Sequence, residues 1–224
     1  MPSIYLIFIV MFVATMLIQL YLRNTYSRWQ QQPAASGLSG AETARTILRA
    51  NGLGHVGVEE VPGQLTDHYD PTKQVVRLST INYRTASVAA HAVAAHEVGH
   101  AIQHAQAYGP LKLRSALVPV ANLGARFAPW IIIGGFVLGL TGLAQVGVIL
   151  FGAAVLFQVV TLPVEYDASR RAGQQLEALG IATTSEVAGT KQVLNAAALT
   201  YVAAAASSVL YLLYYASMFM GNRD

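Results

Sequence analysis

The sequence predicts a mainly α membrane protein, with four transmembrane helices and a small cytoplasmic α+β region. Three observations lead to this fold class. Of the 224 residues, 54% are hydrophobic and 11% are charged, which is more apolar than an ordinary soluble domain. Apolar runs long enough to cross a bilayer recur along the chain. The polar segments between them carry turn residues, short alternating strands and one strongly patterned helix.

The residue inventory restricts partners and cofactors. The chain contains no cysteine, so disulfides and thiolate ligands are excluded, and any bound metal must be held by His, Asp or Glu. The 14 Lys and Arg residues are scattered instead of gathered on one basic face, which argues against a nucleic-acid partner. The lipid bilayer is therefore the first expected partner, and we interpret the basic residues as topology signals.

The first transmembrane helix is predicted at residues 3–22, SIYLIFIVMFVATMLIQLYL. This run is uncharged and has about the 20 residues that a spanning helix needs. A cleaved signal peptide is the alternative, but no Lys or Arg precedes the run, which is also longer than the apolar core of a signal peptide. Arg23 and Arg28 follow it, so the positive-inside rule places the N-terminus outside and residue 23 onward in the cytoplasm.

A transmembrane hairpin of two helices is predicted at residues 116–163, a stretch too long for one span. We expect its turn in the uncharged residues 140–145. Arg126 lies in the first of the two helices, where an ionisable group is costly in lipid. Either Arg126 has a function in the helix bundle, or this helix begins near Pro129 after an interfacial segment.

The fourth transmembrane helix is predicted at residues 196–220. Its small residues suit close helix packing, and its tyrosines suit the membrane interface. Residues 164–195 are predicted to be a cytoplasmic helical segment, because Arg170, Arg171 and Lys191 lie there. This topology leaves both chain termini outside.

Residues 23–115 are predicted to form the cytoplasmic α+β region. A linker at 30–37 leads to a helix that begins with the capping-box pattern of Ser39 and Glu42. A second helix is predicted at about 85–106. Short strands are predicted between the two helices, around HVGVEEV, LTDHY and KQVVRLS.

The second of these helices carries the sequence His96-Glu97-Val98-Gly99-His100, which fits the pattern H-E-x-x-H. Residues four apart on a helix project from one face, so both imidazoles can bind one zinc ion. Glu97 is then placed to act as general base on a zinc-activated water. The alternative is a chance pattern, but unliganded histidines and a glutamate in such apolar surroundings would be costly to bury.

A third metal ligand is expected from another segment on the same side of the membrane. Two spans separate His100 from residues 164–195, so both return to the cytoplasmic side. Glu165 lies where the third span ends, at the start of a new helical stretch near Pro163, and is the predicted third ligand. A solvated carboxylate at a helix start is the alternative for Glu165, and Asp167 is the next candidate ligand.

The motifs LTDHYDP, VVRLS, AAHEVGHAIQ and PVEYDASRRAG resemble those of the neutral zinc metallopeptidase family of YugP-like membrane proteases. This family is akin to HtpX and the CAAX-type prenyl-protein proteases. The resemblance implies a zincin-like protease of the bacterial cell membrane, with His96, His100 and Glu165 as ligands and Glu97 as base, the gluzincin arrangement. The wider group often has an aspartate four residues after the ligand glutamate. Ser169 stands there in this chain, so either Ser169 or Asp167 is expected to orient a ligand imidazole.

Three further residues are site candidates. His104 follows His100 by one turn, as an alternative ligand, a substrate contact, a residue supporting the ligands or an exposed histidine. An edge strand containing His68 and Tyr69 is either an ordinary hairpin or a surface that binds an extended peptide. In the second case Tyr69 or His68 stabilises the oxyanion of the tetrahedral intermediate.

The predicted function is a zinc metalloendopeptidase that binds one Zn²⁺ per chain and cleaves proteins or peptides, chiefly membrane proteins, at the cytoplasmic membrane surface. A scaffold protein with a structural zinc is the main alternative, distinguished by a fourth protein ligand. A transporter and a site-2-type intramembrane protease fit less well. A homo-oligomer is compatible with the sequence, which contains no feature that predicts one.

Overall fold

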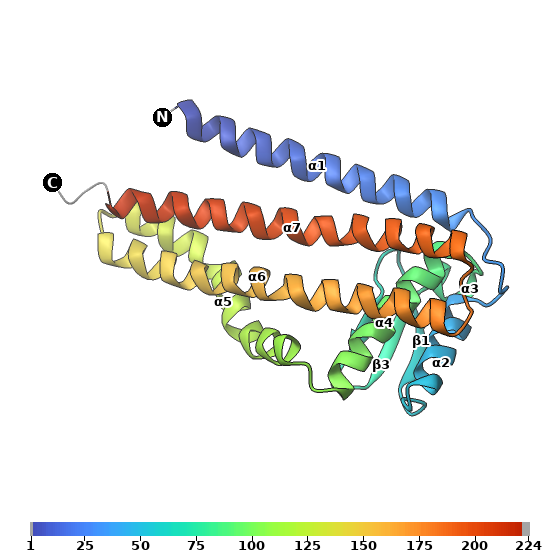
Figure 1. The fold of residues 1–224 in the computed structure, drawn as a ribbon. Coiled ribbons are helices and arrows are strands. Elements are labelled where there is room, and N and C mark those ends of the chain that lie inside the picture. Colours follow the sequence, from blue (N-terminus) through green and yellow to red (C-terminus); the bar gives the residue numbers. More distant parts are fainter. Residues whose placement is uncertain (1, 221–224) are drawn as a thin grey trace. The chain divides into compact units, whose positions relative to one another are not determined.

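The computed structural model describes residues 2–220, and the side chains of residues 6–218 (Figure 1). The mainly α fold class is confirmed, as are four helices long and apolar enough to cross a membrane and a small sheet. The chain divides into two compact units. One comprises residues 1–15, 109–163 and 200–224, and the other comprises residues 16–108 and 164–199.

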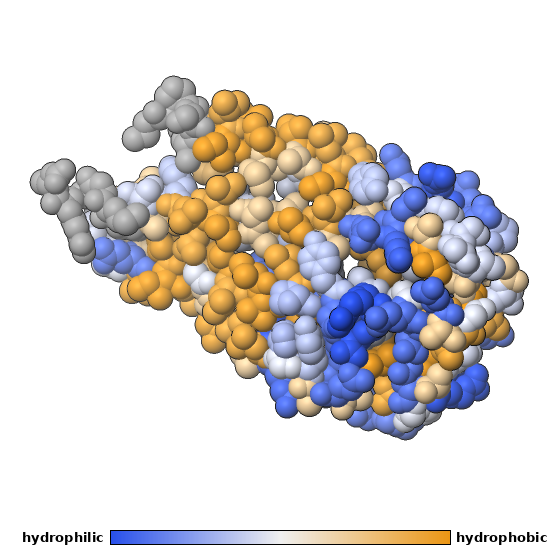
Figure 2. Space-filling model, in the orientation of Figure 1, coloured by the Kyte–Doolittle hydropathy of each residue, from blue (hydrophilic) through white to orange (hydrophobic). Residues whose placement is uncertain are grey.

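The first unit is built from apolar helices. It contains all of α5 (Gly109–Val137) and parts of α1 (Pro2–Gln30), α6 (Thr141–Ala178) and α7 (Thr184–Met220). Large apolar side chains remain exposed on these helices, and Figure 2 shows many hydrophobic residues at the surface. Exposure of this extent on helices of this length is typical of a surface that faces lipid.

Close packing joins α5 and α6 within this unit. A Cβ atom on Gly135 would lie 2.5 Å from the backbone nitrogen of Ala144, so only glycine allows this approach. The turn between the helices contains Gly139, whose φ of +67° suits glycine. The turn predicted at 140–145 is wrong, because α6 already begins at Thr141.

The predicted helix start near Pro163 is also wrong, as is the alternative start near Pro129, because proline does not interrupt the helices at these positions. Pro129 lies inside α5, and Pro163 lies inside α6. A long apolar helix tolerates proline when neighbouring groups compensate for the lost backbone hydrogen bond. Residues 164–195 comprise the end of α6, a short loop and the start of α7. Arg126 is exposed on α5, with its guanidinium 5.4 Å from the ring centroid of Phe127.

The second unit contains a three-stranded sheet. Its strands are β1 (Gly57–Val61), β2 (His68–Asp70) and β3 (Val75–Ser79), in the order β1-β3-β2. β3 pairs in parallel with β1 and antiparallel with β2. The residues of β3 are buried at four of five positions, whereas β2 is a short edge strand.

Helices α2 (Gly40–Ala50), α3 (Thr80–Arg84) and α4 (Val88–Ala105) complete this unit with the end of α6 and the start of α7. The predicted capping box of Ser39 and Glu42 is present at α2. At α4, the Ser87 side chain accepts a hydrogen bond from the backbone N–H of Ala90 and so fixes where the helix begins. One apolar core joins these elements, with Ile47, Leu48, Leu78, Val98 and Leu176 among its buried members.

The segment between α1 and α2 is held against this unit. α1 continues beyond the predicted span to Gln30, and Pro33 then forms a β-bridge with Ser87. The backbone N–H of Ala35 donates to the Glu186 carboxylate at 2.6 Å. The bridge to Ser87 joins the segment to the start of α4, the helix that carries His96 and His100, and the contact with Glu186 joins it to α7.

Candidate metal centre

Three potential ligands converge between α4 and α6. Oε2 of Glu165 lies 3.2 Å from Nε2 of His96 and 3.7 Å from Nε2 of His100. One ligand atom from each residue lies within 4.8 Å of the other two. Zinc bonds of about 2.0–2.1 Å place tetrahedral ligand atoms roughly 3.3–3.4 Å apart. The spacing and the chemistry of this donor set therefore fit a zinc ion.

Burial at the centre is uneven. Glu165 and Glu97 are 3% and 8% exposed, whereas the side chains of His96 and His100 keep 14% and 12% of their surface. A buried carboxylate needs compensation from a cation or hydrogen bonds. The partly exposed imidazoles leave the centre accessible to a small molecule such as water.

Close approach of two backbones brings the ligands together. A Cβ atom on Gly99 would lie 2.7 Å from the backbone oxygen of Ala168 and 3.1 Å from its Cα. Gly99 precedes His100, and Ala168 lies three residues after Glu165 on α6. The glycine inside the H-E-x-x-H pattern therefore allows α4 to lie against α6 beside the ligands.

Ser169 lies within hydrogen-bond distance of His96. Its Oγ lies 3.2 Å from Nδ1 of His96. When Nδ1–H donates to this oxygen, Nε2 is unprotonated and carries the lone pair that a metal requires. Ser169, which stands where the wider group often has an aspartate, therefore contacts the imidazole of a candidate ligand directly.

A longer chain of hydrogen bonds orients His100. Nδ1 of His100 donates to Oε1 of Gln103 at 3.0 Å. Nε2 of Gln103 donates in turn to the backbone oxygen of Val164 at 2.8 Å and to Oδ2 of Asp167 at 2.9 Å. Gln103 is completely buried, and both of its amide protons are used, so its oxygen is held toward His100. Gln103 thus links Asp167 to His100 by hydrogen bonds.

Two arginines balance the charge of Asp167. Nε of Arg171 donates to Asp167 at 2.5 Å, and Arg170 donates to the other carboxylate oxygen. Arg171 also donates to Gln106 at 2.7 Å, and its guanidinium lies 5.9 Å from the ring centroid of Tyr108.

Sequence reasoning assigned no role to Gln103. The available signal was an amide in an apolar run, three residues after a ligand histidine.

The electrostatic setting of Glu97 differs from that of His100. Burial raises the pKa of the Glu97 carboxyl group, His96 and His100 lower it, and Glu165 and Asp67 raise it, with a net rise. Burial lowers the pKa of His100, but its hydrogen bond to Glu165 and the charges of Glu97 and Glu165 outweigh this effect. The pKa values of both groups are therefore raised, chiefly by burial for Glu97 and by neighbouring carboxylates for His100.

The remaining candidates separate into two faces of β2. Tyr69 faces α4, where its hydroxyl lies 2.9 Å from Nδ1 of His104. Neighbouring strand residues point to opposite faces, and Nδ1 of His68 bonds to the backbone oxygen of Thr66, with Arg77 near its other nitrogen. His104 does not belong to the three-ligand group found among the described residues.

Comparison with known proteins defines the class. Residues 4–220 match the family described as "Putative neutral zinc metallopeptidase", and the chain belongs to this family. A relative of the chain is the "Putative membrane protease YugP" of Bacillus subtilis (strain 168), 49% identical over 206 residues that cover 92% of each protein. No solved structure matches the chain. The resemblance stated from the motifs is confirmed, and family membership implies zinc.

Proposed function

We propose that this protein is a zinc-dependent metalloendopeptidase embedded in the bacterial cell membrane. The convergence of His96, His100 and Glu165, in a chain that belongs to a zinc metallopeptidase family, is the observation that supports the proposal most strongly. The protease name of the Bacillus subtilis relative points the same way. One Zn²⁺ per chain is held by these three residues in a zincin-like, gluzincin-type arrangement.

Each residue has a defined task in the proposed reaction. A zinc ion held by His96, His100 and Glu165 would lower the pKa of a bound water molecule toward neutrality and would polarise the substrate carbonyl. Glu97 takes a proton from the water and passes it to the leaving amine. Ser169 and Gln103 keep the ligand imidazoles in the required tautomer. Tyr69, which faces α4, is the better of the two strand candidates for stabilising the oxyanion.

The proposed substrates are membrane proteins, cleaved at the cytoplasmic surface. Glu165 lies on α6, directly after a stretch apolar enough to cross a membrane, and α4 is followed by the apolar α5. The basic residues next to the apolar runs favour the cytoplasm for both ligand segments. Among the described strands β2 is an edge strand, which suits pairing with an extended substrate chain.

A structural zinc site is the less favoured alternative. Such sites usually have four protein ligands, whereas the group found in the described part of the chain has three. The two candidates for a fourth ligand have other partners, because His104 bonds with Tyr69 and Asp167 bonds with Gln103 and two arginines.

Glu97→Gln tests the proposal. We expect purified wild-type protein to contain about one zinc and to cleave casein or a membrane-protein substrate. Glu97→Gln should keep the zinc and lose about 10²–10⁴-fold in cleavage rate, because only the base is removed. Glu177→Gln, an exposed glutamate on α6, is the matched control and should behave as wild type. Zinc content by mass spectrometry and cleavage by gel assay are measured side by side. If wild type and Glu97→Gln hold zinc and neither cleaves any protein offered, the structural alternative is favoured.

A further inference from the structure

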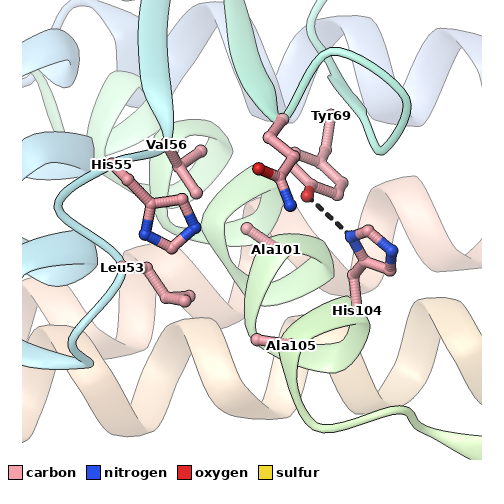
Figure 3. A pocket seen from close by; sticks show the side chains of 8 residues that line it. Leu53, His55, Val56, Tyr69, Ala101, His104 and Ala105 are labelled. Carbon is pink, nitrogen blue, oxygen red and sulfur yellow. Dashed lines mark hydrogen bonds between the residues drawn. The ribbon is translucent and has the colours of Figure 1, made fainter.

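A pocket of about 220 Å³ lies beside the C-terminal half of α4 (Figure 3). Its walls come from the loop before β1, from β2 and the turn after it, and from α4. We propose that this pocket receives one large apolar side chain of the peptide substrate, within two residues of the bond that is cleaved. The inference rests on the proposed proteolytic function and adds the selectivity of that site. The lining residues are Leu53, His55, Val56, Tyr69, Gln74, Ala101, His104 and Ala105.

The lining favours an uncharged, apolar occupant. The buried lining residues, Leu53, Val56 and Ala101, are aliphatic, whereas the polar residues His55, Gln74 and His104 are exposed, and no Asp, Glu, Lys or Arg lines the pocket. Two of the polar lining residues, Tyr69 and His104, are joined to each other by a hydrogen bond, drawn in Figure 3. A charged side chain placed here would lose water without gaining an ionic partner.

The volume suits one side chain. Pockets for whole drug-sized ligands have volumes of about 300–1,000 Å³, so a volume of about 220 Å³ is too small for such a ligand. It accommodates a side chain as large as leucine or phenylalanine. A peptide would therefore place one residue in the pocket while the rest of its chain lies outside.

Helix geometry relates the pocket to the proposed base. Glu97, Ala101 and His104 are spaced by four and three residues, so they lie along one face of α4. With a rise of about 1.5 Å per residue, Ala101 is roughly 6 Å and His104 roughly 10 Å from Glu97 along the helix axis. An extended peptide advances about 3.3 Å per residue, so these distances correspond to roughly two or three residues. A side chain in the near end of the pocket thus belongs to a residue close to the cleaved bond.

Scanning peptides test the inference with the full-length protein in detergent. The probes are decapeptides of alanine and lysine in which one phenylalanine occupies each position in turn. We expect cleavage by wild type to be fastest when phenylalanine lies at one position within two residues of the cleaved bond. The advantage in kcat/KM over the same peptide with alanine should be about 10–200-fold.

Ala105→Phe fills the pocket from an exposed position at the end of α4, where added volume is tolerated by the fold. It should reduce the phenylalanine advantage to less than about threefold. Ala178→Phe is the matched control, because Ala178 is an exposed alanine at the end of α6 outside the pocket, and should leave the advantage unchanged.

Peptide binding to Glu97→Gln gives a readout that does not depend on turnover. The ratio of Kd values for the phenylalanine and alanine peptides should fall when Ala105→Phe is added. If wild type cleaves but shows no positional preference, or if Ala105→Phe keeps both the kinetic and the binding preference, the pocket assignment is overturned while the proteolytic function stands. If no peptide or protein is cleaved, the proposed function fails, and the binding ratio alone decides whether the pocket selects apolar side chains.

Discussion

The two histidines of the centre are supported in different ways at the level of single residues. His96 has a direct neighbour in Ser169, whereas His100 depends on Gln103, whose amide is held by Asp167 and Val164. Groups that hydrogen-bond the non-ligating nitrogen of a metal-binding histidine commonly change metal affinity by about 10–100-fold. The contributions of Ser169 and Gln103 to zinc affinity can therefore be measured by substituting these residues.

Gln103→Leu should weaken zinc binding. Leucine keeps most of the buried volume, but Nδ1 of His100 loses its acceptor and Asp167 loses a donor. We expect zinc affinity to fall about 10–100-fold, measured by competition with a chromophoric chelator. Gln174→Leu, at an exposed glutamine of α6, is the control and should bind zinc as wild type does. Unchanged zinc affinity in Gln103→Leu would show that Gln103 does not orient the ligand.

His91 should make stability depend on pH. It is buried and lies 2.6 Å from the backbone oxygen of Leu38. Burial lowers its pKa below the ordinary value of 6.5, and the contacts with Leu38 and Glu186 offset only part of this. As pH falls below 6.5, the unfolded chain binds a proton that the folded chain does not, so the stability contributed by neutral His91 is lost.

His91→Gln should remove this dependence, since the amide can still donate to Leu38. We expect the thermal midpoint of wild type to fall more steeply than that of the variant from about pH 7.5 to about pH 5.5. Parallel curves over this range would contradict the assignment of a depressed pKa to His91.

At the scale of elements, the contact between α4 and α6 decides whether the ligands meet. Gly99 lies under the backbone of Ala168, so Gly99→Ala must push the helices apart. We expect a loss of about 1–3 kcal/mol in the free energy of unfolding and weaker zinc binding. Gly173→Ala is the control, because a Cβ at Gly173 meets no atom within 4 Å and alanine favours the helix. Thermal unfolding and zinc titration of both variants test this expectation. Equal stability and equal zinc affinity of Gly99→Ala and Gly173→Ala would show that the close approach of Gly99 to Ala168 is not needed.

Some element boundaries followed from the sequence and others did not. The apolar runs, the capping box at Ser39 and the helix that carries His96 and His100 follow local patterns in the sequence. The turn near Gly139 and the continuous helix through Pro163 depend on what packs beside them. Local pattern therefore predicted where helices exist better than where they end.

At the scale of the whole molecule, the membrane topology is open to a direct test. The chain has no cysteine, so single cysteines can report accessibility without background. Lys73 lies exposed in the turn between β2 and β3, and Leu138 is 67% exposed between α5 and α6. We expect Leu138→Cys, but not Lys73→Cys, to react with a membrane-impermeant maleimide in intact cells.

Lys73→Cys should react after the cells are permeabilised, which shows that the thiol is reactive. Labelling of Lys73→Cys in intact cells, with Leu138→Cys protected, would place the metal ligands outside and contradict the proposed cytoplasmic cleavage. The two positions serve as controls for each other because the proposed topology places them on opposite sides.

The sequence by itself determined that the chain has long apolar helices, that His96, Glu97 and His100 form the H-E-x-x-H pattern, and that the chain resembles a zinc metallopeptidase family. These properties depend on composition and on spacings of a few residues, which do not require knowledge of distant contacts. Only the tertiary structure decided that Gln103 links Asp167 to His100, that Ser169 contacts His96, and that Tyr69 and not His68 faces α4. Most of these contacts join residues that are far apart in the sequence and that packing brings together. The others depend on the direction that a side chain takes. Local periodicity of the sequence encodes neither the long-range packing nor the side-chain direction.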